Sequence, residues 1–108
     1  MPPSLSITVS ERSAPVVITL TGEFDLAGQE AFESVLLPIW KNPSPGIVLD
    51  LTGLTFMDSS GIKSVMQFRQ RCAHARRSLD VRVSEPVLYV LRLTGLTGIL
   101  GIEDAQTA

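Results

Sequence analysis

Two serine hydroxyls stand between an acid and a glycine in the middle of this chain, at Asp58, Ser59, Ser60 and Gly61. An apolar, β-branched run precedes them at residues 46–51, and apolar residues at helical spacing follow them. We therefore expect a buried strand and then a helix that begins between Asp58 and Gly61. Aspartate and serine cap such a start, because their side-chain oxygens accept hydrogen bonds from the first unpaired N–H groups. These four residues are either a helix cap and nothing more, or a display of hydroxyls to another molecule.

Nucleophilic serine catalysis has little support in the sequence. His74 is the single histidine, so a Ser-His-Asp relay would have to join it to Ser59 or Ser60. It stands near the far end of the helix that begins at Ser60, on the order of 20 Å away at about 1.5 Å per residue. We expect His74 to interact with the dipole at the C-terminal end of that helix, and we predict that the chain is not an enzyme.

Two further patterns predict neither a metal ion nor a cofactor. The spaced glycines of residues 95–101 precede no helix start and lack the Lys-Ser/Thr pair of a phosphate-binding loop, so we expect turns there. Cys72 is the single cysteine, which rules out an internal disulfide and argues against a cysteine-based metal cluster. Its expected role is packing in the core.

The elements that must position the two serines alternate between strands and helices after an initial strand pair. Strands are expected at residues 5–9, 16–20, 46–51, 80–83 and 99–102, and helices at residues 27–40, at about 60–75, and after Ser84. Pro38 should end or kink the first helix, because proline has no N–H group. The order predicts a single α/β domain in which βαβ units build a mixed sheet of about five strands.

The third helix should place one apolar stripe against the sheet and end at a glycine. That stripe consists of Val87, Val90, Leu91 and Thr94. Gly95 follows as the expected C-terminal cap.

Composition fits a small globular protein. The chain has 108 residues, of which 44% are hydrophobic, and this is enough for one core. The net charge is −2 and the nine basic residues are scattered, so we expect no direct nucleic-acid contact. The densest basic group is most simply the solvated face of the second helix, with a partner-docking surface as the alternative; it comprises Arg69, Arg71, Arg76 and Arg77. No signal-peptide pattern and no apolar run of about 18 residues is present, which predicts a cytoplasmic protein without membrane insertion.

Three motifs in order resemble the STAS domain family, specifically its single-domain anti-sigma factor antagonists. They lie at residues 22–25, 54–61 and 93–96, within a match over residues 7–102. The resemblance implies one STAS domain over residues 1–108. Such family members bind an anti-sigma factor that is also a serine kinase, and so release a sigma factor. They are switched off when that kinase phosphorylates the second serine of the Asp-Ser-Ser-Gly motif, which is Ser60 in this chain.

The resemblance also implies a partner surface around that serine. The residues implied for it are Glu23, Asp25, Asp58, Ser59, Ser60, Gly61, Ile62 and Lys63. Asp25 has a second interpretation, as the cap of the first helix. The implied partners are the anti-sigma factor kinase and a serine phosphatase that resets the switch, with the chain itself a monomer or weak dimer. Two alternatives are a constitutive STAS subunit that stabilises the ATPase of a lipid transport complex, and a nucleotide-binding sensor domain.

A phosphate on Ser60 suits a helix start on physical grounds. It adds about −1.5 to −2 charge at neutral pH, and free N–H groups at a helix N-terminus bind anions by donating hydrogen bonds to them. We therefore expect the fold to survive phosphorylation while close partner contact does not. Lys63 departs from the family, which often has a glycine at this position. We expect this cation either to weaken the effect of the phosphate or to contact an acidic partner.

Overall fold

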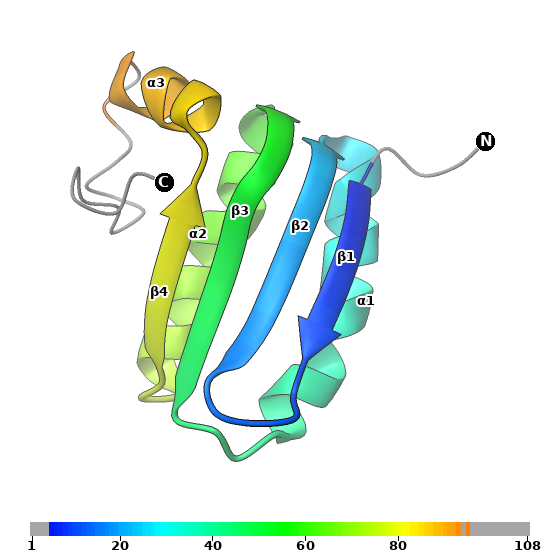
Figure 1. The fold of residues 1–108 in the computed structure, drawn as a ribbon, viewed down its shortest axis with the longest axis vertical. Helices are drawn as coiled ribbons and strands as arrows, with labels where there is room; N and C mark the ends of the chain where they lie inside the picture. The colour runs from blue at the N-terminus through cyan, green and yellow to red at the C-terminus, as the bar shows by residue number, and fades with distance from the viewer. Residues whose placement is uncertain (1–4, 94, 96–108) are drawn as a thin grey trace.

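The computed structural model describes residues 5–93 and residue 95. In this range the strands are β1 (Leu5–Ser10), β2 (Val16–Phe24), β3 (Gly46–Met57) and β4 (Ser78–Val83), and the helices are α1 (Leu26–Lys41), α2 (Ser59–His74) and α3 (Glu85–Leu93). The sheet order is β1-β2-β3-β4 (Figure 1). β1 is antiparallel to β2, whereas β2, β3 and β4 are parallel. The predicted α/β architecture is thus confirmed.

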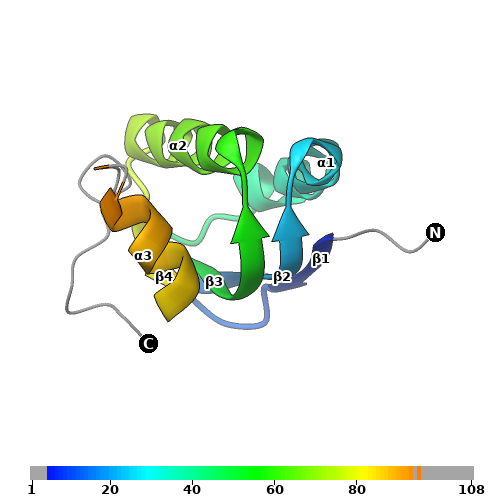
Figure 2. The ribbon, with the colours of Figure 1, turned by 90° about the horizontal axis from the view of Figure 1, so that it is seen from above.

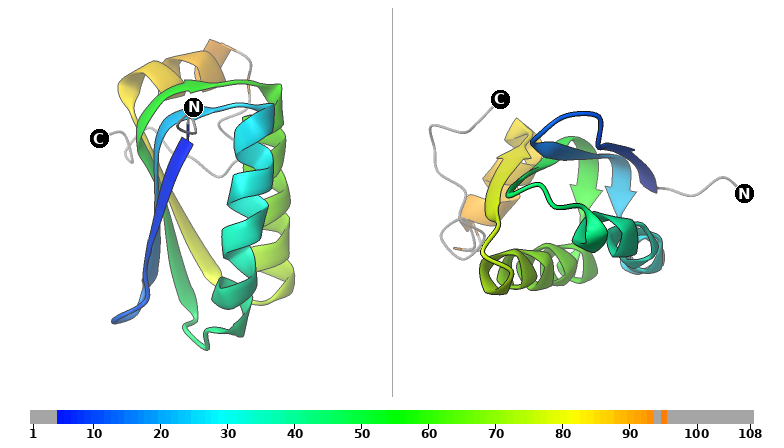
Figure 3. Two further views of the ribbon diagram at one scale, coloured as in Figure 1. Left: turned by 90° about the vertical axis from the view of Figure 1, so that its right-hand side faces the viewer. Right: turned by 90° about the horizontal axis from the view of Figure 1, so that it is seen from below.

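Two βαβ units account for the layers of the molecule. α1 connects β2 to β3 and α2 connects β3 to β4, so each helix crosses over between parallel neighbours. Both helices lie against the same face of the sheet (Figures 2 and 3). α3 lies across one end of the sheet, beside the end of β3 (Figure 1).

The core forms between α1, α2 and the sheet. Alternate strand residues face the helices, as in Ile18 and Leu20 of β2 and Leu49 of β3, each with no exposed surface. Edge-on aromatic contacts connect β2 to α1 and α1 to α2: the ring centroids of Phe24 and Phe32 are 5.4 Å apart, and those of Phe32 and Phe68 are 5.6 Å apart.

Cys72 is buried in this core, as the sequence predicts. Burial raises the pKa of its thiol from 9.0 to about 11, since the apolar surroundings disfavour the thiolate; the charges of Arg77 and Arg71 act in the opposite direction.

Two central strands are longer than the sequence indicates. The predicted ends at residues 20 and 51 are wrong, since β2 continues to Phe24 and β3 to Met57. Glycines allow the extension. Gly22 has a φ of 99° where the register shifts, and a Cβ on Gly53 would lie 2.5 Å from Cγ2 of Thr21. Turn-favouring glycines therefore stand inside strands here.

α1 does not end at Pro38, which corrects that part of the prediction. The helix continues to Lys41, with Pro38 on its exposed side. Ile39 in the last turn is fully buried, and the Trp40 ring lies 5.4 Å from that of Phe68. Packing of this turn outweighs the hydrogen bond that proline cannot donate.

Arg77 contradicts the interpretation of the basic group as one solvated helix face. α2 ends at His74, so Arg76 and Arg77 lie beyond the helix. The Arg77 guanidinium donates hydrogen bonds to the carbonyl oxygens of Ile39, Trp40 and Asn42. It therefore satisfies carbonyl groups at the C-terminal end of α1.

α3 buries Val87, Leu88 and Leu91, of which Leu88 is absent from the predicted stripe. Gly95 has a φ of 73° and its N–H donates to the carbonyl oxygen of Arg92, as expected of a C-terminal cap.

The described sheet has four strands, where about five are predicted. The predicted strand at residues 99–102 and Thr94 lie outside the described residues. Within the described ranges, none of the helices has the length and apolar character needed to cross a membrane.

Candidate partner-binding site

The predicted site residues meet at one edge of the sheet. Glu23 pairs in register with Phe56, and Phe24 pairs with Met57, so β2 and β3 end side by side. Each strand then leads directly into a helix, and α1 and α2 begin at the same edge (Figure 1). We call residues 23–25 and 56–63 the helix-start edge. It contains all eight residues that the sequence assigns to a partner surface.

Asp58 caps α2, which confirms the predicted helix start. One carboxylate oxygen, Oδ1, accepts hydrogen bonds from the N–H groups of Ser60 at 2.9 Å and Gly61 at 3.1 Å. These two N–H groups are therefore not free to receive a phosphate, so the cap takes part of the anion site that we expected. A phosphoryl group on Ser60 would instead share this helix start with a carboxylate.

The serines differ in how far they reach solvent. Ser59 is exposed and Ser60 is partly buried, at the first and second positions of α2. Gly61 is buried, and a Cβ there would lie 2.6 Å from the carbonyl oxygen of Phe24. The N–H of Asp58 donates to the same carbonyl oxygen at 3.2 Å. Gly61 thus lets α2 begin against the end of β2, and so fixes where Ser60 lies.

Asp25 caps α1, so its structural interpretation is confirmed. Its Oδ1 accepts a hydrogen bond from the N–H of Gly28 at 3.1 Å. Glu23 and Lys63 are different, since both side chains are exposed and neither side chain makes a hydrogen bond or ion pair with any described residue. The fold therefore does not explain these two charges at the helix-start edge.

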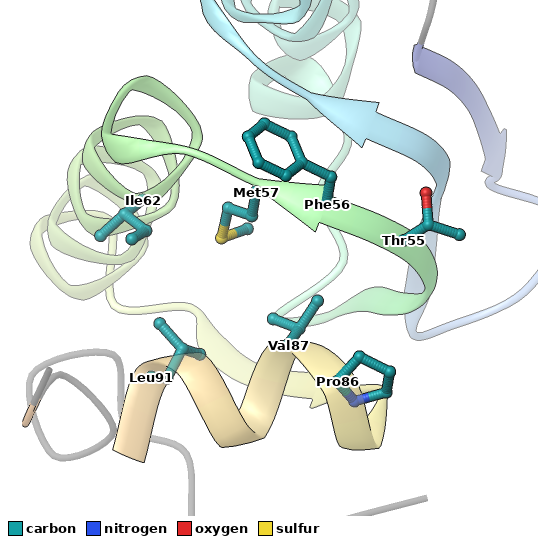
Figure 4. A pocket seen from close by; sticks show the side chains of 7 residues that line it. All are labelled: Thr55, Phe56, Met57, Ile62, Pro86, Val87 and Leu91. Carbon is teal, nitrogen blue, oxygen red and sulfur yellow. The ribbon is translucent and has the colours of Figure 1, made fainter. Parts of the chain in front are cut away.

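An apolar pocket adjoins the helix-start edge and was not predicted from the sequence. Its volume is about 220 Å³ and it lies between the end of β3, the first turn of α2, and α3 (Figure 4). Its lining residues are Thr55, Phe56, Met57, Ile62, Pro86, Val87 and Leu91. Phe56 is 49% exposed. The sequence offered one signal for this pocket, the aromatic residue Phe56 just before the Asp-Ser-Ser-Gly motif. Only the fold brings α3 beside it.

The remaining candidate for chemistry lies at the other end of α2. His74 is exposed in the last turn of α2, the end of the helix at which the sequence places it. No described histidine, cysteine, aspartate or glutamate belongs to a group of three placed to hold a metal ion.

Residues 7–101 match the family model described as "Mlab, STAS domain", so the chain belongs to this STAS family. A curated relative, the anti-sigma-F factor antagonist RsfB of Mycobacterium tuberculosis, is 29% identical over 62 residues, which are 57% of this chain. The match spans about half, 51%, of that relative's length.

Solved structures share the fold. A crystal structure of an anti-sigma factor antagonist from Mycobacterium paratuberculosis superposes with a TM-score of 0.81, at 22% identity, over 96% of this chain and 89% of that one. The anti-sigma factor antagonist SpoIIAA in its unphosphorylated form gives 0.65 at 24% identity, over 95% and 86%. The phosphorylated form of SpoIIAA, described as a Bacillus cell fate determinant, gives 0.59 at 24% identity, over 95% and 89%.

Proposed function

We propose that this protein is an anti-sigma factor antagonist that binds an anti-sigma factor through the helix-start edge and so releases a sigma factor. The observation that carries the proposal is the juxtaposition at this edge of exposed Ser59, partly buried Ser60 and two charges that the fold does not use, Glu23 and Lys63. The curated relative and two of the solved structures are themselves anti-sigma factor antagonists, which supports the same function. In this proposal the protein acts in the bacterial cytoplasm as a binding module without catalysis, as a monomer or weak dimer.

The proposed switch is phosphorylation of Ser60 by an anti-sigma factor with serine kinase activity, reversed by a serine phosphatase. A phosphoryl group would add a bulky, hydrated charge of about −1.5 to −2 next to the Asp58 carboxylate. A partner surface that packs over Ser60 would have to remove water from both anions, which costs free energy. That SpoIIAA has been solved in both an unphosphorylated and a phosphorylated form supports a modification of this kind.

Phosphate transfer tests the proposal. The wild-type chain is incubated with ATP and the anti-sigma factor kinase from the same cell, and mass spectrometry locates the product. We expect Ser60→Ala to abolish phosphate incorporation, while its affinity for the anti-sigma factor stays close to that of the unphosphorylated wild type. Ser59→Ala should remain a substrate of the kinase. Phosphate on Ser59, Thr55 or Ser64 would refute the assignment.

The constitutive alternative keeps one observation in its favour, the cation Lys63 where the family often has glycine. In that alternative the same edge binds the ATPase of a transport complex and Ser60 is never phosphorylated. A stable ATPase complex together with no transfer to Ser60 would select it. Nucleotide binding by the isolated chain would select the sensor alternative.

A further inference from the structure

The helix start that would carry the phosphate holds one carboxylate already. Asp58 Oδ1 occupies the N–H groups of Ser60 and Gly61, and the N–H of Ile62 donates to the Asp58 carbonyl oxygen at 3.0 Å. A phosphoryl group on Ser60 therefore faces a like charge, and the N–H groups of Ser60, Gly61 and Ile62 already have acceptors. A nearby cationic side chain would offset this repulsion.

Lys63 is placed to supply it. On a helix, residues three apart lie on the same face with about 5–6 Å between their Cβ atoms, so Lys63 stands one turn beyond Ser60. Its side chain is exposed and makes no ion pair with any described residue, so no described acid competes for it. The next basic residue of α2, Arg69, is nine residues from Ser60, about 13 Å along the axis.

We propose that Lys63 is the intramolecular counter-ion of a phosphoryl group on Ser60, a role that rests on the proposed phosphorylation. The lysine would neutralise part of the charge that the modification adds. The α2 cap would then survive phosphorylation even though Asp58 stays in place. Lys63 would thus set how strongly the phosphorylated state differs from the unmodified one. At the helix-start edge itself the other charged groups are all acidic, namely Glu23 at the end of β2, Asp25 before α1 and Asp58. Glu85 begins α3, and the basic residues of these helices, Lys41, Arg69, Arg71 and Arg92, lie further along them.

The test installs phosphoserine at position 60 during synthesis, so that it does not depend on a kinase. Phosphorus NMR titration then gives the second pKa of the phosphate in the wild-type chain, in Lys63→Met and in Lys63→Arg. We expect Lys63→Met to raise this pKa by about 0.2 to 0.4 units at low ionic strength, and Lys63→Arg to leave it close to wild type. In about 1 M salt the difference should vanish, because the Debye length falls to about 3 Å.

A matched control and a second readout complete the experiment. Lys41→Met removes an exposed lysine at the far end of α1 and should leave the phosphate pKa unchanged. The loss of melting temperature caused by phosphoserine should be larger in Lys63→Met than in wild type. Equal pKa values and equal melting losses in wild type and Lys63→Met would overturn the inference. That result would leave the proposed function intact, whereas failure of kinase transfer to Ser60 would leave this measurement unaffected.

Discussion

Individual residues at the helix-start edge divide into those that the fold needs and those that it does not use. Asp25 and Asp58 cap helices, and Gly61 provides close approach to Phe24. The side chains of Glu23 and Lys63 are exposed and make no hydrogen bond or ion pair in the described part of the chain. This division predicts different outcomes for charge-neutralising substitutions at otherwise similar acids.

Asp25→Asn and Glu23→Gln separate capping from recognition. We expect both variants to melt close to wild type, because Asn is nearly as good a cap as Asp and Glu23 has no structural role. Both should bind the anti-sigma factor less well. Loss of a buried charge-assisted contact costs about 2 to 5 kcal/mol, whereas loss of a rim charge mainly slows association and reduces its salt dependence. Since Glu23 is exposed, we expect the second pattern for it.

Thermal melts measure the capping role, and titration with the anti-sigma factor measures the recognition role. Wild-type affinity and wild-type phosphorylation in both variants would remove these acids from the site.

Gly61→Ala should destabilise the protein by about 1 to 3 kcal/mol, the usual range for overpacking. The added Cβ would lie 2.6 Å from the Phe24 carbonyl oxygen, so α2 has to move away from β2. Gly46→Ala is the control, because a Cβ there meets its nearest atom, Cβ of Pro15, at 3.4 Å. Denaturant unfolding of both variants measures the difference. Equal stability of Gly61→Ala and wild type would show that this close approach is not needed.

Among the elements, the C-terminal end of α1, opposite the site, is contacted by the side chain of Arg77. Arg77 donates to three carbonyl oxygens around the end of α1, and its guanidinium carbon lies 5.7 Å from the Trp40 ring centroid. We expect Arg77→Ala to cost about 1.5 to 3 kcal/mol, the range for hydrogen bonds to charged groups. Arg82→Ala should cost at most about 1 kcal/mol, since its ion pair with Asp80 is exposed. Unfolding midpoints test the pair, and equal losses would contradict a capping role for Arg77.

The elements themselves were largely predictable because their apolar periods are strong. The strand pair, the two crossover helices and the helix start at Asp58 follow from local patterns alone. The strand extensions beyond residues 20 and 51 do not, because glycine normally indicates a turn and only the neighbouring strand explains Gly22 and Gly53. Likewise Pro38 indicates a helix end, and only tertiary packing of Ile39 and Trp40 keeps the last turn.

For the site, too, the sequence predicts residues but not the contacts that depend on tertiary structure. Its residues were assigned by resemblance, and the fold brings all eight to one edge, but the pocket beside α3 depends on contacts between segments about thirty residues apart. The occupied N–H groups at the start of α2 also required side-chain geometry, since a cap signal does not say which donors remain free.

For the whole molecule, the buried thiol predicts how stability varies at high pH. The Cys72 pKa is raised to about 11 in the folded state from 9.0, so between these values the unfolded chain loses a proton that the folded chain keeps. Stability should therefore fall as pH rises from about 9 to about 11, by up to about 1.4 kcal/mol per pH unit from this group, with no contribution below pH 9. Unfolding free energies at several pH values compare wild type with Cys72→Ala. Equal slopes in the two proteins would contradict the prediction.

As a whole molecule, the protein is proposed to be a switch that one serine, Ser60, controls. Calorimetric titration of the anti-sigma factor into the unmodified chain, and into the chain with phosphoserine installed at position 60, measures it most directly. We predict tight binding of the unmodified chain and affinity at least about tenfold weaker, ~1.4 kcal/mol, for the phosphorylated one, with both chains folded by circular dichroism. Equal affinity of the two folded forms would contradict control of binding by phosphorylation of Ser60.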